Sequence, residues 1–170
     1  MQGGIYIVEI ENREYKYYTC RKDRAFKEVF LNDKDTSLLK ALLESILKIS
    51  INNIIIKNDE LNNNNVNSKR KLVDALLYTD DSVINIEVNS CDEDYVRPRN
   101  FAYITNSYSN YVLKSQEYDM NIQFIQINFS YDLKYNELCR IYKVRDTLNN
   151  SSELFIDNFE IYEFNMLNIS

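Results

Sequence analysis

The chain has 170 residues, of which 45% are hydrophobic and 27% charged, and its net charge is −6. This length and composition fit one globular domain with a proper core. The sequence contains no histidine, which excludes most zinc sites and nucleophilic catalysis of the Ser-His-Asp and Cys-His types. Catalysis in such a chain would depend on carboxylates, amines, tyrosines or a hard metal ion.

Membrane and export signals are not visible in this sequence. No apolar run is long enough to cross a bilayer, and the first residues lack the basic and apolar segments of a secretory signal. We therefore expect a cytoplasmic protein with no membrane partner. Three cysteines, Cys20, Cys91 and Cys139, lack CxxC spacing and are expected to be buried or idle thiols. The negative charge argues against a general nucleic-acid coat protein but leaves room for a local basic groove.

The N-terminal part is predicted to contain a short extension followed by two helices. Residues 1–18 alternate briefly between isoleucine and polar residues, as in an edge strand or a loose extension. Residues 24–30 predict one or two helical turns. Residues 35–48 predict a longer helix, because capping residues precede apolar residues at helical spacing. These apolar positions are Leu38, Leu39, Leu42, Leu43, Ile46 and Leu47.

The middle of the chain is predicted to form a short strand, a loop and a hairpin. Residues 54–57 read as the strand, and the asparagine-rich residues 57–68 as the loop. The hairpin strands are Lys71–Tyr78 and Val83–Ser90. Between them, Thr79–Ser82 has the composition of a tight turn.

The remaining residues predict one long helix and three strands. Pro98 lies near the start of the helix, where proline is best tolerated, and the helix continues to about Lys114. Residues 121–129 alternate as a largely buried strand, and residues 139–144 and 159–164 read as two more. The whole order predicts an α/β fold with a mixed β-sheet flanked by helices.

Two acidic residues occupy symmetrical positions in the predicted hairpin. If Asp80 and Asp81 form a two-residue loop, Asp74 and Glu87 lie opposite each other, because both are equally far from the loop. The apolar face would then be Val73, Ala75, Leu77, Ile84, Ile86 and Val88. Directly opposed like charges are destabilising, so the pair requires a reason.

The opposed acids have two explanations. A divalent cation such as Mg²⁺, held through one or two carboxylates and substrate phosphates, would account for them. Alternatively, Asp74 and Glu87 are ordinary exposed strand residues. A lysine held permanently between the two carboxylates would argue against the metal site.

Several segments together resemble the PD-(D/E)XK nuclease family transposases, also called Rpn-type recombination-promoting nucleases. The similarity spans roughly Lys22 to Met166, with the segments in the family's order. They are Asp23–Phe30, Leu38–Leu47, Lys71–Asp74, Ile84–Asn89, the helix from Arg99 through Tyr103 and Tyr108, and Phe159–Tyr162. The resemblance implies a restriction-endonuclease-like PD-(D/E)XK core and metal-dependent cleavage of DNA.

The resemblance also implies roles for individual residues. Asp74 would match the family's first strand acid and Glu87 the acid of its Glu-x-Gln or Glu-x-Lys element, and both would hold Mg²⁺ or Mn²⁺. Asn89 stands where glutamine or lysine is expected, as a substitute that orients the attacking water. Asparagine is shorter than glutamine and uncharged, so this departure bears on turnover and not on the fold.

Three further residues are candidates from the same resemblance. Lys27 lies in a Phe-Lys-x-x-Phe segment and could approach a phosphate of DNA; the alternative is a solvated helix lysine. Glu44, on the longer helix, is a candidate third metal ligand. Arg99 is a candidate contact to the DNA backbone.

The domain organisation and function follow from these assignments. Residues 1–21 are expected to form an N-terminal extension or edge strand, and residues 22–170 the nuclease-like domain. The predicted function is a metal-dependent DNA endonuclease of the mobile-element or recombination type, with a homodimer as a candidate assembly. The alternatives are a catalytically decayed protein that binds and regulates another protein, including as a DNA mimic, and an inactive remnant of a mobile element.

Overall fold

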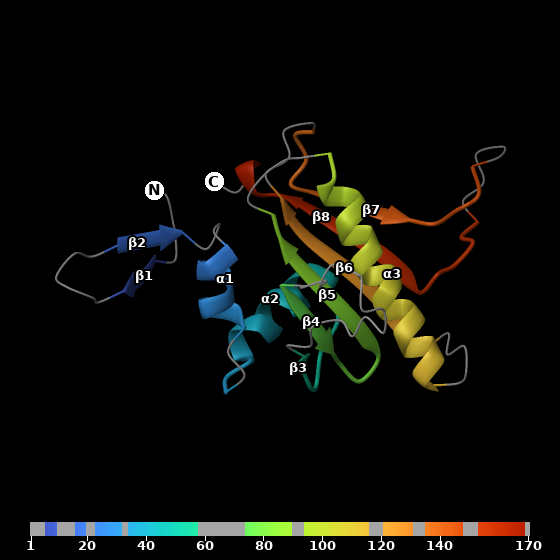
Figure 1. Ribbon diagram of the computed structural model, residues 1–170, viewed down its shortest axis with the longest axis horizontal. Helices are drawn as coiled ribbons and strands as arrows, with labels where there is room; N and C mark the ends of the chain where they lie inside the picture. The colour runs from blue at the N-terminus through green and yellow to red at the C-terminus, as the bar shows by residue number, and fades with distance from the viewer. Residues whose placement is uncertain are drawn as a thin grey trace, which may run out of the picture.

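The computed structural model describes residues 6–9, 16–19, 23–31, 34–57, 74–89, 94–115, 121–130, 135–147 and 153–168 (Figure 1). Its elements, in chain order, are β1 (Tyr6–Glu9), β2 (Lys16–Thr19), α1 (Asp23–Phe30), α2 (Ser37–Leu47), β3 (Ile55–Lys57), β4 (Ala75–Tyr78), β5 (Ser82–Val88), α3 (Val96–Ser115), β6 (Gln123–Ser130), β7 (Cys139–Lys143), β8 (Phe159–Asn165) and a short 3₁₀ helix (Met166–Asn168).

The main sheet has six strands in the order β3-β4-β5-β6-β8-β7. The central strands β5, β6 and β8 are parallel to one another. The outer pairs β3–β4, β4–β5 and β7–β8 are antiparallel. This arrangement confirms the predicted mixed sheet with helices. β1 and β2 pair in a separate two-stranded sheet, so they do not extend the edge of the six-stranded sheet.

Helices cover both faces of the main sheet, with α3 in front of it and α2 behind it in the view of Figure 1. On the α2 face, Leu39 and Leu43 pack with Leu77, Ile86 and other buried residues in one apolar cluster. On the α3 face, Ile104 packs in a second cluster with Leu76, Val83, Phe124 and Phe159. Both faces of β5 are therefore covered, and all seven of its residues are buried.

The hairpin has the predicted register. Ala75 pairs with Ile86 and Tyr78 with Val83, and the Thr79 N–H donates to the Ser82 carbonyl at 2.9 Å. Asp80 and Asp81 are thus the two-residue loop. The apolar face is buried as predicted at all of its described positions, namely Ala75, Leu77, Ile84, Ile86 and Val88. Residues 71–73, including Val73, lie outside the described residues.

The first turn of α3 carries two arginines on either side of Pro98. The helix begins at Val96, so Pro98 lies within the first turn, as predicted. Arg97 and Arg99 place positive charge at the end of the helix where the dipole disfavours it. Acidic side chains on the sheet would offset this unfavourable interaction of the two arginines with the helix dipole.

Several sequence predictions fall outside the described part of the chain. These are the asparagine-rich loop from residue 58 onward and the cysteines Cys20 and Cys91. Cys139 is a free cysteine of intermediate exposure, and burial raises the pKa of its thiol. In the described ranges, no helix is long and apolar enough to cross a membrane.

Replacing Ile86 by alanine is expected to lower the free energy of unfolding by about 2–5 kcal/mol, because the side chain is fully buried between β5 and α2. Ile55→Ala, at an exposed position of β3, is the matched control and should change stability by no more than about 0.5 kcal/mol. Urea unfolding measures both. Equal losses in the two variants would contradict the described packing.

Candidate metal and nuclease site

Asp74 and Glu87 lie together at the end of the hairpin away from its loop. The Asp74 N–H donates to Glu87 Oε1 at 3.2 Å. In return, the Val88 N–H donates to Asp74 Oδ2 at 2.7 Å. Each carboxylate thus accepts a backbone hydrogen bond from the opposite chain segment, and the two acids lie side by side as the hairpin register predicted.

The two acids differ in burial. Glu87 is only 3% exposed, because α3 covers the face of β5 from which it projects. Asp74 precedes β4 and is of intermediate exposure. The explanation that both acids are ordinary exposed strand residues is therefore wrong for Glu87. A buried carboxylate of this kind requires compensating charge or hydrogen bonds.

Two cationic side chains supply that compensation from opposite faces of the sheet. Lys27 of α1 lies 3.0 Å from Asp74 Oδ1. Arg99 of α3 lies 3.7 Å from Glu87 Oε2, which is too long for a hydrogen bond. Both residues are candidate contacts to DNA from the sequence, and the structure brings both to the acids.

The carboxyl group of Glu87 has a strongly raised pKa. Burial, together with the nearby Asp74 charge, raises the pKa of Glu87 to about 8. The hydrogen bond from the Asp74 N–H and the charge of Arg99 oppose these effects. A strongly raised carboxyl pKa beside a second acid is a typical mark of a functional site.

Asn89 lies on the same side of β5 as Glu87, and both ends of its amide are engaged. Its Oδ1 accepts from Arg99 at 2.6 Å and from Asn100 at 3.4 Å. Its Nδ2 donates to the Ser130 hydroxyl at 2.9 Å. The residue is therefore a buried link between Arg99 and β6.

Glu44 is not brought to this pair. Its Oε1 accepts from the Ile51 N–H at 2.9 Å and lies 3.9 Å from Lys40. The carboxylate is thus used in the turn that follows α2. In the residues whose positions are described, no three acidic or cysteine side chains cluster as metal ligands.

Sequence reasoning missed a set of buried polar residues beside the acids on the α3 face. Asn100 donates to Asn128 at 2.9 Å, and Gln126 donates to the same oxygen at 2.7 Å. Asn85 donates to Gln126 at 2.8 Å. A signal was present in the sequence, because polar residues alternate with isoleucines along both β5 and β6. These polar positions are Asn85, Glu87, Asn89, Gln126 and Asn128.

A second acid–arginine pair lies on the same face, farther along the sheet. Arg97 donates to both carboxylate oxygens of Glu163, at 3.0 Å and 2.8 Å. Glu163 is buried in β8, while Arg97 is half exposed. The register aligns Glu87 with Asn128 and Asn128 with Glu163. The two acid–arginine pairs therefore lie on the two strands that flank β6, one on each side of Asn128.

A six-stranded mixed sheet between helices, with paired acids at the end of a hairpin, is an α/β arrangement consistent with a PD-(D/E)XK nuclease fold. The chain belongs to the PD-(D/E)XK nuclease family transposases, whose family model matches residues 20–170. This finding confirms the resemblance and the expected fold. No curated protein and no solved structure matches the chain.

In a chelating buffer, Glu87→Gln is expected to stabilise the protein at about pH 9. The folded pKa of Glu87, about 8, lies above its ordinary value of 4.5. Its contribution to stability is thus complete below about pH 4.5 and is lost as the pH rises through about 8. The variant has no such titration, so its advantage grows from about pH 6 to about pH 9, on the order of a few kcal/mol.

Urea unfolding at both pH values measures this advantage. Asp157→Asn, which removes an exposed carboxylate, is the control and should show no growing advantage. A Glu87→Gln protein that is no more stable than the wild type at about pH 9 would contradict the described burial.

Proposed function

We propose that this chain is a metal-dependent DNA endonuclease of the mobile-element or recombination type. It hydrolyses phosphodiester bonds of DNA in a site formed by Asp74 and Glu87. Membership of a transposase nuclease family implies DNA as the partner. The observation that carries the proposal is the pairing of these two acids, in which a buried carboxyl with a raised pKa lies beside a second carboxylate. Association with a second copy of the chain stays a prediction.

The donor set fits Mg²⁺ or Mn²⁺. Carboxylate oxygens are the ligands that hard cations prefer, and Mg²⁺ is commonly bound through one or two carboxylates together with substrate phosphates. Asp74 and Glu87 would hold the ion, and Lys27 and Arg99 now neutralise the same two groups. When bound, the ion would polarise the phosphate and activate water.

Lys27 and Arg99 are suited to binding the DNA backbone. Each is partly exposed, with 40% of the Lys27 side chain and 35% of the Arg99 side chain accessible. Each can exchange its carboxylate partner for a phosphate oxygen when a metal ion neutralises the acids. Arg99 in particular offers the planar group that suits phosphate recognition.

Asn89 is proposed to act through Arg99. Its carbonyl oxygen accepts the short hydrogen bond from the guanidinium, and its amide is anchored on Ser130. The residue thereby fixes the direction of Arg99 toward Glu87. This positioning role needs neither the length nor the charge of the glutamine or lysine expected at this position.

Purified protein with Mn²⁺ or Mg²⁺ is expected to cleave DNA, and Asp74→Asn or Glu87→Gln should lower the rate by about a thousandfold, since each removes a metal ligand. Cleavage of a labelled duplex is the readout. Asp157→Asn should cleave as the wild type does. Circular dichroism verifies that the variants are folded, and undiminished cleavage by folded Asp74→Asn would refute the proposed site.

Lys27→Ala is expected to weaken DNA binding in Ca²⁺ similarly for all DNA sequences and to reduce the slope of affinity against salt by about one, because one phosphate contact is lost. Fluorescence anisotropy at several salt concentrations measures the slope. Lys40→Ala is a matched control, since its side chain is 39% exposed and pairs with Glu44 of α2. If the salt dependence of affinity has the same slope in both variants, Lys27 does not contact the DNA backbone.

A protein-binding role on the same fold is the second candidate. It is favoured by one observation, namely that both carboxylates already have cationic partners. In that case the acids would be structural, and the protein would regulate another protein or mimic DNA. Titration calorimetry with Mn²⁺ separates the candidates, because heat of binding that is lost in Asp74→Asn supports the nuclease and no binding supports the regulator.

A further inference from the structure

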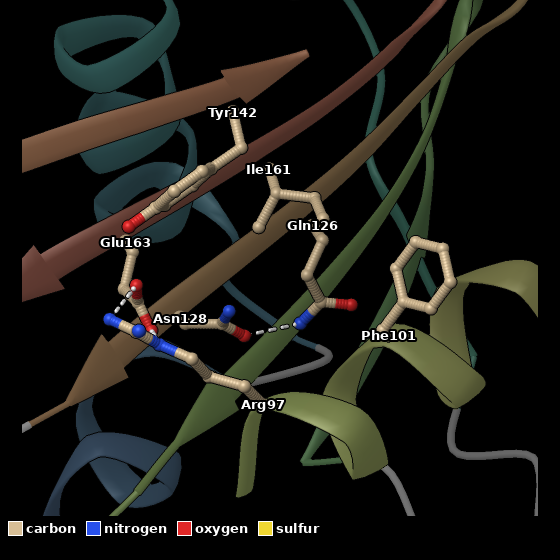
Figure 2. Close-up of a pocket in the computed structure, with 7 residues that line it drawn as sticks. All are labelled: Arg97, Phe101, Gln126, Asn128, Tyr142, Ile161 and Glu163. Atoms are coloured by element: carbon tan, nitrogen blue, oxygen red, sulfur yellow. Dashed lines mark hydrogen bonds and ion pairs between the residues drawn. The ribbon is translucent and has the colours of Figure 1, made fainter. Parts of the chain in front are cut away.

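A pocket of about 210 Å³ lies between the first turns of α3 and the strands β6, β8 and β7. Figure 2 shows the rings of Phe101 and Tyr142 on opposite sides of the pocket, with Ile161 and Gln126 between them and Asn128 next to Arg97 and Glu163. Phe101 is 50% exposed and Tyr142 is 40% exposed. Two accessible aromatic rings thus flank a pocket that is also lined by an apolar side chain, Ile161, and by the amide groups of Gln126 and Asn128.

Asn128 presents a hydrogen-bond donor in this pocket. Its Oδ1 already accepts from Asn100 and Gln126, and these bonds fix the orientation of the amide. For its Nδ2, the described contacts include no acceptor, although the residue is only 4% exposed. Figure 2 shows the Asn128 amide with its oxygen joined to Gln126 by a dashed line and its nitrogen beside that oxygen. A donor held in one orientation by neighbouring hydrogen bonds, on a residue that lines a pocket, suits an acceptor on a small ligand.

The rim of the pocket is charged. Arg97 forms the two hydrogen bonds to Glu163 described above, and 48% of its side chain is exposed. A planar guanidinium at a pocket rim can stack on a base or contact a phosphate. The pocket thus combines aromatic rings, an arginine plane and an amide donor, which are the groups that bind unstacked nucleobases.

The pocket lies on the same face of the sheet as the paired acids. Glu87, Asn128 and Glu163 are aligned on the neighbouring strands β5, β6 and β8. Two strand spacings correspond to about 10 Å, and bases repeat about every 3.4 Å along a DNA strand. A base in the pocket would therefore belong to a nucleotide only a few steps from a phosphate at Asp74 and Glu87.

We propose that this pocket binds an unpaired nucleobase of the DNA that is cleaved at Asp74 and Glu87. The proposal rests on the proposed function for the identity of the nucleic acid. The base stacks against Phe101 and Tyr142 and accepts a hydrogen bond from Asn128. Because a paired base must first leave the duplex, and an extrahelical base is already unstacked, the pocket selects DNA that contains unpaired bases.

The test compares three duplexes of equal length by fluorescence anisotropy in Ca²⁺, so that binding is measured without cleavage. One duplex has a single extrahelical base, the second has an abasic residue at the same bulge, and the third is fully paired. The abasic bulge keeps the distorted backbone and removes only the base. The wild-type protein is expected to bind the base-containing bulge about tenfold more tightly than the abasic bulge.

Phe101→Ala and Tyr142→Ala should each abolish most of this preference and leave affinity for the paired duplex unchanged. Both side chains are substantially exposed, so neither replacement should prevent folding. Phe155→Ala is the matched control, because Phe155 is 87% exposed and is not among the residues that line this pocket. It should retain the full preference.

Equal affinity of the wild type for the two bulges would overturn the proposal, whether or not the protein cleaves DNA. Loss of the preference in Phe155→Ala would also overturn it, because the effect would not belong to this pocket. A preference that depends on Phe101 in a protein that does not cleave would support base binding and refute only the nuclease activity.

Discussion

The exchange of hydrogen bonds between Asp74 and the strand that carries Glu87 is the interaction on which the site depends. It fixes the end of the hairpin, because each of the two segments donates one backbone hydrogen bond to the other. It also holds two carboxyl groups together, which is unfavourable when both are ionised. Lys27 approaches from α1 and Arg99 from α3. The acids are thus the point at which the sheet and the helices of both its faces meet.

The α3 face of the sheet is held by polar contacts as much as by apolar packing. Asn89, Asn100, Gln126 and Asn128 form a connected set of hydrogen bonds between α3, β5 and β6. Buried networks of this kind favour one relative position of the elements, because a shift would break several buried hydrogen bonds at once. These bonds hold the helix that carries Arg97 and Arg99 in place over Glu87 and Glu163.

Local patterns were sufficient to predict much of this arrangement. Period-two alternation and the Asp80-Asp81 turn predicted the hairpin register, and with it the meeting of Asp74 and Glu87. The burial of Glu87 could not be predicted in this way, because it depends on α3 packing over a face that the hairpin alone leaves open. The position of Glu44 likewise depends on its bond to the Ile51 backbone after α2, which helical periodicity does not reveal.

The two arginines in the first turn of α3 have a consequence for how this chain can change over generations. The positive charge of each arginine is unfavourable near the N-terminus of the helix. Each is paired with one glutamate, Arg99 with Glu87 and Arg97 with Glu163. A descendant that lost either acid would retain an unfavourable charge at the start of the helix. We expect the members of each pair to be replaced together across relatives, so that covariation would report this contact without any coordinates.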